Sequence, residues 1–287
     1  MLYNSYNVQA ELARKHYEDM ERKYPKEIVE CIRKTRTYGG ELYNAEVEHK
    51  RIEADHKKLG KIEEVSPILQ QNTTDGMLFN LPQTAQTKIA LLNFASYKSA
   101  GGGFINGAKA QEECLCHSSI LYNVLVRKHE YYEWNQRNIN HGLYTDRALY
   151  TSGVIFEDPK GKAYKCDVIT CAAPNRSICQ TSNYFAATQP VTEEQNDIVL
   201  KNRISFIADI CMKENVDTVI LGAWGCGVFS QDPHKVAKYF YETFKETGIA
   251  CIYAIPDEKT YKAFEDTFEE LMNGRIYKNL DNETLER

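Results

Sequence analysis

The sequence has no long apolar run, no paired cysteine motif and no excess of positive charge. A helix that crosses a membrane needs roughly 18 consecutive apolar residues, and no such run occurs among the 287 residues. The nine cysteines form no C-x-x-C pair, and an odd number cannot pair completely. The formal net charge of −5 disfavours nucleic-acid binding, which relies on Lys and Arg to neutralise phosphates. We therefore expect neither a membrane nor a nucleic acid as a partner.

The start of the chain also lacks the features of a secretory signal. Residues 1–20 contain neither an apolar h-region nor a small-residue cleavage site. Several cysteines, among them Cys166, Cys211 and Cys251, lie in apolar runs, as is typical of reduced and buried thiols. These features favour a cytoplasmic protein. Hydrophobic residues make up 43% of the sequence, which is enough for a substantial core.

The N-terminal part of the chain is highly charged and carries few apolar anchors. Stretches 8–23 and 27–36 have helical composition, Pro25 breaks or starts a helix, and Gly39–Gly40 marks a turn. We expect residues 1–60 to form an N-terminal helical extension that acts as a lid or brace and not as an independent domain.

From about residue 61, short apolar runs alternate with helical patterns. The runs expected to form buried strands are 88–94, 167–173, 218–221 and 249–255. The segments with helical spacing are 111–131, 194–214 and 233–247. Near-continuous apolar strands that alternate with helices imply an α/β domain whose sheet is covered on both faces. We expect this domain to span residues 61–278 and residues 279–287 to be a frayed polar tail.

A run of three glycines, Gly101–Gly103, follows the first of these strands, and Gln111-Glu112-Glu113 then opens a helix. Consecutive glycines allow a close approach of the backbone to a ligand and permit positive φ. Two adjacent carboxylates suit glycosidic chemistry, which needs an acid at the leaving oxygen and groups that orient sugar hydroxyls. Adjacent helical residues point roughly 100° apart, so the two glutamates should have different roles. The alternative is an ordinary strand-to-helix loop with acidic residues that favour the first helical turn.

A second glycine-containing loop, Gly222 to Phe229, follows the strand predicted at 218–221 and precedes a helix. Its glycines, Gly222, Gly225 and Gly227, permit a turn whose backbone N–H groups can cradle a diphosphate. No Lys follows the glycines, as a Walker A loop would require, and G-x-G-x-x-G is not matched. The alternative interpretation is a plain turn between a strand and a helix.

These two motifs resemble the signatures of poly(ADP-ribose) glycohydrolases, a branch of the macrodomain fold. In that family GGG is followed by a short spacer and then by QEE. Here Gly101–Gly103 are followed by residues 104–110 and then by Gln111–Glu113. The second loop is similar to the macrodomain diphosphate loop, G-A-x-G-C-G-V-F. The flanking segments LLNFAS and CLCHSSILY look like the short microbial-type branch. The resemblance covers about residues 61–270 and implies a three-layer α/β/α macrodomain with a mixed central sheet.

The resemblance also implies roles for the two acidic residues and for their neighbour. Glu113 would be the general acid and base, Glu112 would bind the hydroxyls of the terminal ribose, and Gln111 would help shape the site. A carboxylate at a helix N-terminus should have a lowered pKa, whereas a general acid needs its proton near neutral pH. Burial under the substrate and repulsion from neighbouring negative charge would have to raise the pKa.

For the phosphate loop, the resemblance implies that the amides of Ala223 to Val228 hold the diphosphate. Phe229 would stack on the distal ribose or the adenine, and Cys226 would be a small filler at a tight turn. Asn93 and Ser96 lie where macrodomains place polar contacts to the distal ribose, although related glycohydrolases commonly have Asn at the position of Ser96. Asn175 has either a ligand contact or a turn role.

Two weaker features were considered as parts of the site. Cys114, Cys116 and His117 fit no zinc spacing, so we expect no metal, and the chemistry requires no cofactor. The tyrosines that could form an adenine platform, with packing as the alternative role, are Tyr131, Tyr132, Tyr144 and Tyr150.

The resemblance implies a glycosidase that hydrolyses the ribose–ribose O-glycosidic bond of poly(ADP-ribose). Its partner is then the polymer or an ADP-ribosylated protein. We expect release of ADP-ribose from the free end, because a wall built by residues 1–60 and by polar loops at 133–158 and 177–193 would exclude internal units. The alternatives are a hydrolase of mono-ADP-ribosyl groups on protein or nucleobase, a non-catalytic ADP-ribose reader, and a nucleotide-binding protein of unrelated fold. A reader would not need the QEE triplet.

Overall fold

The computed structural model describes residues 2–40, 65–84, 86–179 and 191–285. Its centre is a seven-stranded sheet with the order β1-β4-β5-β3-β6-β7-β2. The strands are β1 (Arg36–Gly39), β2 (Ile68–Gln70), β3 (Ile89–Phe94), β4 (Arg147–Glu157), β5 (Ala163–Cys171), β6 (Thr218–Leu221) and β7 (Ala250–Ala254). The pairs β1–β4 and β4–β5 are antiparallel, and the other pairs are parallel, so the sheet is mixed as expected.

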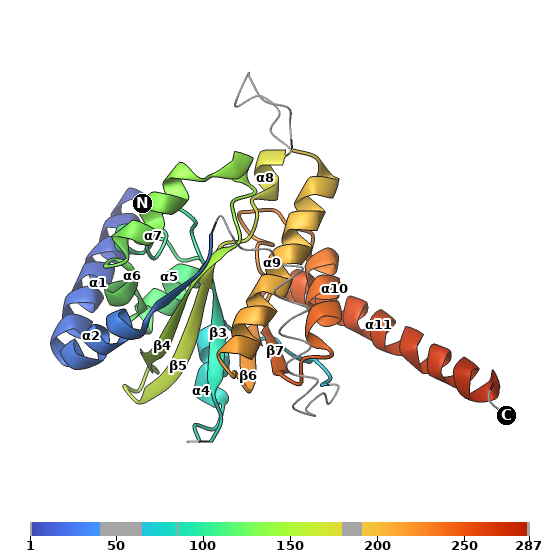
Figure 1. Ribbon diagram of the computed structural model, residues 1–287. Coiled ribbons are helices and arrows are strands. Elements are labelled where there is room, and N and C mark those ends of the chain that lie inside the picture. Colours follow the sequence, from blue (N-terminus) through green and yellow to red (C-terminus); the bar gives the residue numbers. More distant parts are fainter. Residues whose placement is uncertain (1, 41–64, 85, 180–190, 286–287) are drawn as a thin grey trace.

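Helices cover both faces of this sheet (Figure 1). The helices α1 (Leu2–Lys23), α2 (Pro25–Lys34), α4 (Thr74–Asn80), α5 (Gln111–His117), α6 (Leu121–Leu125) and α7 (His129–Arg137) contribute to the core on one face. The helices α9 (Glu193–Lys213), α10 (Pro233–Phe244) and α11 (Glu258–Leu285) contribute to the other. The short helices η1 (Phe104–Asn106), η2 (Asn140–Gly142) and α8 (Arg176–Cys179) lie in the connections. The expected three-layer α/β/α architecture is therefore confirmed.

The central strand β3 shows why the parallel strands are recognisable as unbroken apolar runs. Ala90 and Leu92 belong to the core on one face of the sheet, whereas Ile89 and Leu91 belong to the core on the other. Successive residues of a strand point to opposite faces, and both faces of this sheet are covered by helices. Nearly every residue of the strand is therefore apolar.

Three local expectations were wrong. The single helix expected over 111–131 is three short helices, because Ser119 pairs with Phe156 of β4 and the Ile120 N–H donates to the carbonyl of Ile155. The polar loop expected at 133–158 contains the long strand β4. The tail expected to fray from residue 279 continues α11 as far as Leu285, and Figure 1 shows this helix extending from the body.

The N-terminal segment is part of the core and of the sheet. Ala13 and Met20 of α1 and Ile28 and Cys31 of α2 are buried in the same cluster as β3 and α5. The strand β1 then pairs with β4 and forms one edge of the sheet. The rest of the expected extension, residues 41–60, lies outside the described residues.

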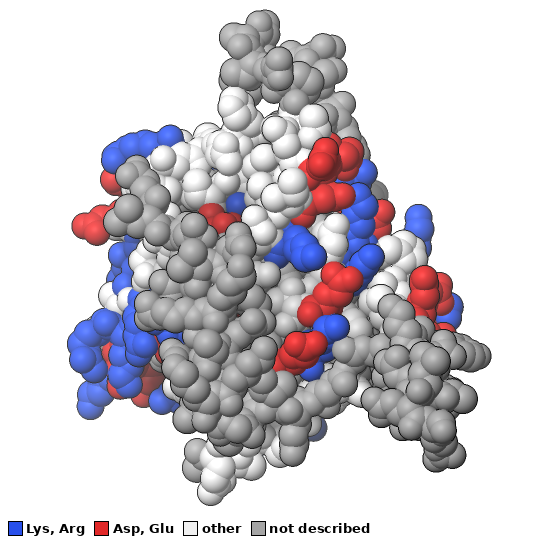
Figure 2. All heavy atoms as spheres, turned by 45° about the vertical axis from the view of Figure 1, so that its right-hand side comes forward, with Lys and Arg blue, Asp and Glu red and all other residues white. Residues whose placement is uncertain are grey.

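The surface carries charges of both signs, and none of the described helices is long and apolar enough to span a membrane. Figure 2 shows Lys and Arg side chains beside Asp and Glu. Among the described ion pairs, Lys235 Nζ lies 2.5 Å from Asp197 Oδ2, and Lys262 Nζ lies 2.5 Å from Glu265 Oε2. Lysines of α10 and α11 are thus paired with carboxylates.

Candidate active site

The two glycine-containing loops meet at the carboxyl ends of neighbouring parallel strands. The strand β3 leads through Phe94 towards the first loop, and β6 leads through Leu221 into the second. Because β3 and β6 pair directly, their following loops lie at the same edge of the sheet. Ligands of open α/β sheets bind at this edge.

The first loop requires glycine for both conformation and space. Gly101 and Gly102 have φ values of +62° and +57°. A Cβ on Gly102 would lie 2.4 Å from Glu113 Oε1 and 3.1 Å from Glu112 Oε2. The loop therefore covers both carboxylates at a distance that no side chain in place of Gly102 would allow.

Glu112 is a buried carboxyl held by one residue of β3 and one residue that follows this strand. Its Oε2 accepts a 2.7 Å hydrogen bond from the Ser96 backbone N–H, and its Oε1 accepts a 3.1 Å bond from Asn93 Nδ2. Burial raises the pKa of Glu112 to about 8, and the nearby charge of Glu113 adds to this increase. At neutral pH this carboxyl therefore retains most of its proton in the unliganded protein.

Glu113 has a different environment, although it is the next residue. Its Oε1 accepts a 2.7 Å hydrogen bond from the Gly103 backbone N–H. Its Oε2 is buried and has no hydrogen-bond partner among the described residues, and neither has Oδ1 of Asn93. Buried polar atoms are normally paired, so both atoms are candidates for contact with a polar ligand group or water.

Gln111, the first residue of the QEE triplet, fixes the start of α5 to its neighbours. Its Oε1 accepts from the Phe94 N–H at 2.8 Å, and its Nε2 donates to the Leu92 carbonyl at 2.9 Å. The same Nε2 lies 3.1 Å from Thr74 Oγ1 of α4. Gln111 thereby sets the position from which the two following glutamates project.

The second loop presents unpaired backbone N–H groups. Across the described residues, no hydrogen bond is donated by the backbone N–H of Gly225, Gly227, Val228 or Phe229. Gly225 has φ +79°, and a Cβ on Gly227 would meet nothing within 4 Å. Donors without acceptors around an open space are suited to an anionic diphosphate.

Hydrogen bonds from residues that were not predicted from the sequence fix the position of this loop. The fully buried Trp224 donates from Nε1 to the Cys171 carbonyl at 3.0 Å. Arg176 donates to the Ser230 carbonyl at 2.8 Å, and the Ser177 N–H donates to the Phe229 carbonyl at 3.2 Å. Each of these bonds joins the loop to a distant segment, either the end of β5 or α8. Such tertiary contacts leave no signal in the local sequence.

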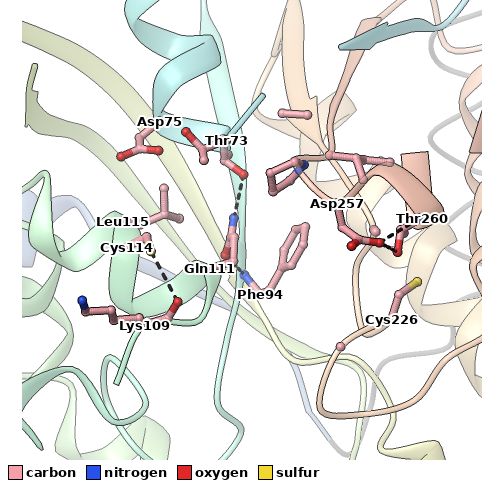
Figure 3. Close-up of a pocket in the computed structure, with 16 residues that line it drawn as sticks. Thr73, Asp75, Phe94, Lys109, Gln111, Cys114, Leu115, Cys226, Asp257 and Thr260 are labelled. Carbon is pink, nitrogen blue, oxygen red and sulfur yellow. Dashed lines mark hydrogen bonds between the residues drawn. The ribbon is translucent and has the colours of Figure 1, made fainter. Parts of the chain in front are cut away.

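Two of the pockets that border the phosphate loop in the described structure also share Phe94, Gln111 and Ala223. The larger has a volume of about 470 Å³ and is lined by Phe94, Gln111, Ala223 and Cys226, with Asp75, Asp257 and Thr260 at other positions (Figure 3). The smaller, of about 200 Å³, shares Phe94, Gln111 and Ala223 and adds Ala110, Val228 and Phe229. Glu112 and Glu113 line neither of these two pockets, and their carboxyl groups lie beneath Gly102.

The walls of the larger pocket include Asp75 and Asp257, which were not among the residues predicted from the sequence. Asp75 lies in the first turn of α4, which Thr73 caps by accepting from the Gly76 N–H. Asp257 precedes α11 and accepts from the Thr260 N–H and hydroxyl. The capping pattern T-T-D-G after a short strand was the available signal for the first of these segments.

Several sequence candidates lie elsewhere or have structural roles. Tyr131, Tyr132 and Tyr150 are buried in the cores, so packing explains them. Tyr144 stacks on Tyr97 with ring centroids 4.1 Å apart and lies 6.0 Å from the ring of Phe229, behind the phosphate loop.

Asn175 and the cysteine–histidine cluster also have positions that the structure defines. Asn175 Oδ1 accepts from the Ser177 N–H and hydroxyl, which is a turn role. Cys116 is buried, whereas Cys114 lines the larger pocket. Within the described ranges, no three His, Cys, Asp or Glu side chains are grouped in a way that could hold a metal ion.

Comparison with known proteins identifies one family. The model of the microbial-type PARG catalytic domain, where PARG denotes poly(ADP-ribose) glycohydrolase, matches residues 8–157. PARG from Thermomonospora curvata bound to the inhibitor ADP-HPD is 26% identical, with a TM-score of 0.74 over 91% of this chain and 99% of that chain. PARG from Deinococcus radiodurans in complex with ADP-ribose is 28% identical, with a TM-score of 0.72 over 85% of this chain and 98% of that chain. No curated protein sequence matches the chain. The matched range begins at residue 8 and so includes most of α1 and all of α2 and β1.

Proposed function

Since the chain belongs to the microbial-type poly(ADP-ribose) glycohydrolase family, we propose that Glu113 and Glu112 cleave the ribose–ribose bond of the terminal ADP-ribose unit. The protein is a glycosidase that hydrolyses poly(ADP-ribose). The observation that carries the assignment is the buried Oε2 of Glu113, which lacks a partner among the described residues and lies beside the glycine loop.

The ligand is proposed to lie across the phosphate loop. The related structures contain ADP-ribose or ADP-HPD. The diphosphate would accept from the unpaired N–H groups of Gly225, Gly227, Val228 and Phe229, and the distal ribose would occupy the smaller pocket near Ala110. The adenine fits the larger pocket, where Phe94 offers an aromatic surface and Asp75 and Asp257 offer acceptors for its amino group.

The reaction then divides between the two glutamates. Glu113 donates a proton to the 2′-oxygen of the leaving unit while the C–O bond breaks and an oxocarbenium-like ribose forms. The ionised Glu113 next takes a proton from a water, whose oxygen bonds to the anomeric carbon, and this step regenerates the acid. Glu112 accepts from the ribose hydroxyls. Burial raises the pKa of Glu112 to about 8, so Glu112 stays largely neutral near pH 7 and adds little negative charge beside Glu113.

The test is incubation with automodified polymerase and, separately, with mono-ADP-ribosylated protein, followed by chromatography of the products. The proposal expects ADP-ribose from the polymer. Release from the mono-modified protein alone would favour the mono-ADP-ribosyl hydrolase instead. Binding of ADP-ribose without any release would indicate a reader. A cytoplasmic site of action stays a prediction that rests on the unpaired thiols of the described cysteines.

Cleavage is proposed to occur at the free end, with release of single ADP-ribose units. The phosphate loop and its two pockets together accommodate one such unit. The wall expected to exclude internal units includes residues 177–193, of which 180–190 lie outside the described residues. Product analysis at early times with long polymer decides the mode. Monomeric ADP-ribose alone is the expected product, whereas free oligomers would contradict cleavage at the end.

A further inference from the structure

Helix α1 lies against the segment that carries the glycine loop and both glutamates. Its inward residues recur at a spacing of three or four, namely Gln9, Ala13, His16 and Met20. Ala13 is fully buried, and Met20 is 6% exposed. This spacing places one face of the helix on the core, and the face begins directly opposite the end of the glycine loop.

The first contact is between two backbones at Gly107. Gly107 has φ +84°, and a Cβ built on it would lie 2.8 Å from Gln9 Cβ and 2.9 Å from Ala10 N. Neither atom is the flexible end of a side chain. A larger residue at this position would therefore displace either α1 or the glycine loop.

The second contact anchors the other end of the same segment. His16 Nε2 lies 3.0 Å from the carbonyl oxygen of Ser119, two residues after α5 ends. The His16 ring also lies 6.3 Å from the ring of Phe104 and 6.4 Å from the ring of His117, measured between centroids. Phe104 is fully buried. Helix α1 thus contacts the segment 101–119 between the glycine loop and the two glutamates, at Phe104 and Gly107, and again after the glutamates, at His117 and Ser119.

A chain of hydrogen bonds connects Gly107 to Glu113. The Gly107 N–H donates to the Phe104 carbonyl at 2.9 Å, and the Ala108 N–H donates to the Gly103 carbonyl at 3.1 Å. The N–H of Gly103 in turn donates to Glu113 Oε1 at 2.7 Å. A shift of the backbone at 107–108 is therefore transmitted to the donor that orients the Glu113 carboxylate.

We propose that α1 is a positioning element of the active site and that Gly107 is the positioning residue through which it acts. The helix does not touch the reacting atoms in this scheme. It holds the turn 103–108 so that Gly103 keeps Glu113 aimed at the leaving oxygen. The inference rests on the proposed catalytic role of Glu113. Displacement of a catalytic group by about 1 Å can cost roughly 100-fold in rate.

The test compares Gly107→Ala with Gly161→Ala. Gly161 has a similar φ of +78°, but a Cβ there meets nothing within 4 Å, so it reproduces the backbone strain without the clash. For Gly107→Ala we expect kcat on poly(ADP-ribose) to fall by about 10- to 100-fold, while the Kd for ADP-ribose in calorimetry stays within about threefold of wild type. For Gly161→Ala we expect wild-type kcat and Kd, with a smaller decrease in Tm that comes from the backbone strain alone.

Wild-type kcat in folded Gly107→Ala would overturn the proposal. An equal loss of ADP-ribose binding and of kcat would also overturn it, because that pattern indicates general damage to the site. If Gly107→Ala does not fold, His16→Ala and His16→Gln replace it. We then expect His16→Ala to lose kcat and His16→Gln to recover it, because Gln can donate to the Ser119 carbonyl. Unchanged kcat in His16→Ala overturns the proposal. Glu113→Gln separates the two hypotheses, because an active Glu113→Gln rejects the proposed function itself.

Discussion

At the scale of single residues, the two adjacent glutamates differ in the groups that donate hydrogen bonds to them. Glu112 accepts from the Ser96 backbone and from the Asn93 side chain, whereas Glu113 accepts from the Gly103 backbone and keeps one oxygen unpaired within the described structure. The expectation of unlike roles, based on their 100° separation along a helix, agrees with these unlike partners.

Replacement of Glu113 by Gln should abolish turnover and preserve binding. The amide oxygen can still accept from the Gly103 N–H, but the amide cannot supply an acidic proton. We expect kcat on poly(ADP-ribose) to fall by about 10²–10⁴, with the Kd for ADP-ribose close to wild type. Glu133→Gln is a matched control, because Glu133 is an exposed residue that pairs with Arg137 in the same helix. Wild-type kcat in Glu113→Gln would reject the assignment.

Replacement of Glu112 by Gln should change how stability depends on pH. Burial raises the pKa of Glu112 from an ordinary 4.5 to about 8. Above pH 4.5 the unfolded chain releases a proton that the folded protein still holds. The stability contributed by protonated Glu112 is therefore complete below pH 4.5 and is lost as the pH rises to about 8.

The Gln variant cannot ionise, so its free energy of unfolding should increase relative to wild type between pH 5 and pH 8. A shift of one pKa unit corresponds to about 1.4 kcal/mol, and we expect a relative change of a few kcal/mol in urea titrations. Parallel pH curves for the two proteins would show that Glu112 does not titrate in this range.

At the scale of elements, the two glycines of the phosphate loop should respond differently to substitution. Gly227 faces open space, so the Val side chain of Gly227→Val would occupy the volume proposed for the diphosphate. We expect loss of ADP-ribose binding in calorimetry, with a stability change within about 0.5 kcal/mol.

Gly225→Val adds a fold defect to the binding defect. Gly225 has φ +79°, and its Cβ would lie 2.7 Å from Ala173 Cβ. This variant should lose more than about 1 kcal/mol of stability as well as binding. Normal affinity in Gly227→Val would remove the loop from the ligand site.

The elements that could be predicted are those whose signal is local. Parallel strands such as β6 are unbroken apolar runs, because both of their faces are buried. The strand β4 was missed, since it carries Arg147, Thr151, Ser152 and Gly153 among its apolar residues. The division of 111–131 into three helices depends on the pairing of Ser119 with Phe156, which is a tertiary contact.

The parts of the candidate site that could be predicted are also those with a local signal. The motifs that bring Gly102, Glu113 and Gly227 together are visible because each motif is contiguous along the chain. The larger pocket is built by Asp75, Phe94 and Asp257 from three separate segments, and no spacing in the sequence relates them. The role of Gly107 also depends on a contact with residues almost one hundred positions away.

At the scale of the whole molecule, the site joins the two helical layers. The larger pocket takes Asp75 and Gln111 from helices on one face of the sheet and Thr260 from a helix on the other (Figure 3). A ligand in this position contacts both layers and binds only when both are folded. ADP-ribose should therefore stabilise the protein as a unit and not only its loops.

At a free ligand concentration of 100 times Kd, binding to the folded state alone contributes about 2.7 kcal/mol. For a chain of this size that corresponds to an increase in Tm of roughly 4–5 °C. Calorimetric scans with and without ADP-ribose measure the shift, with Gly161→Ala expected to keep it and Gly227→Val expected to lose it. A shift of equal size in Gly227→Val would place ADP-ribose elsewhere on the protein. A wild-type transition that splits in two, with only one part displaced by ADP-ribose, would mean that the ligand contacts a single layer.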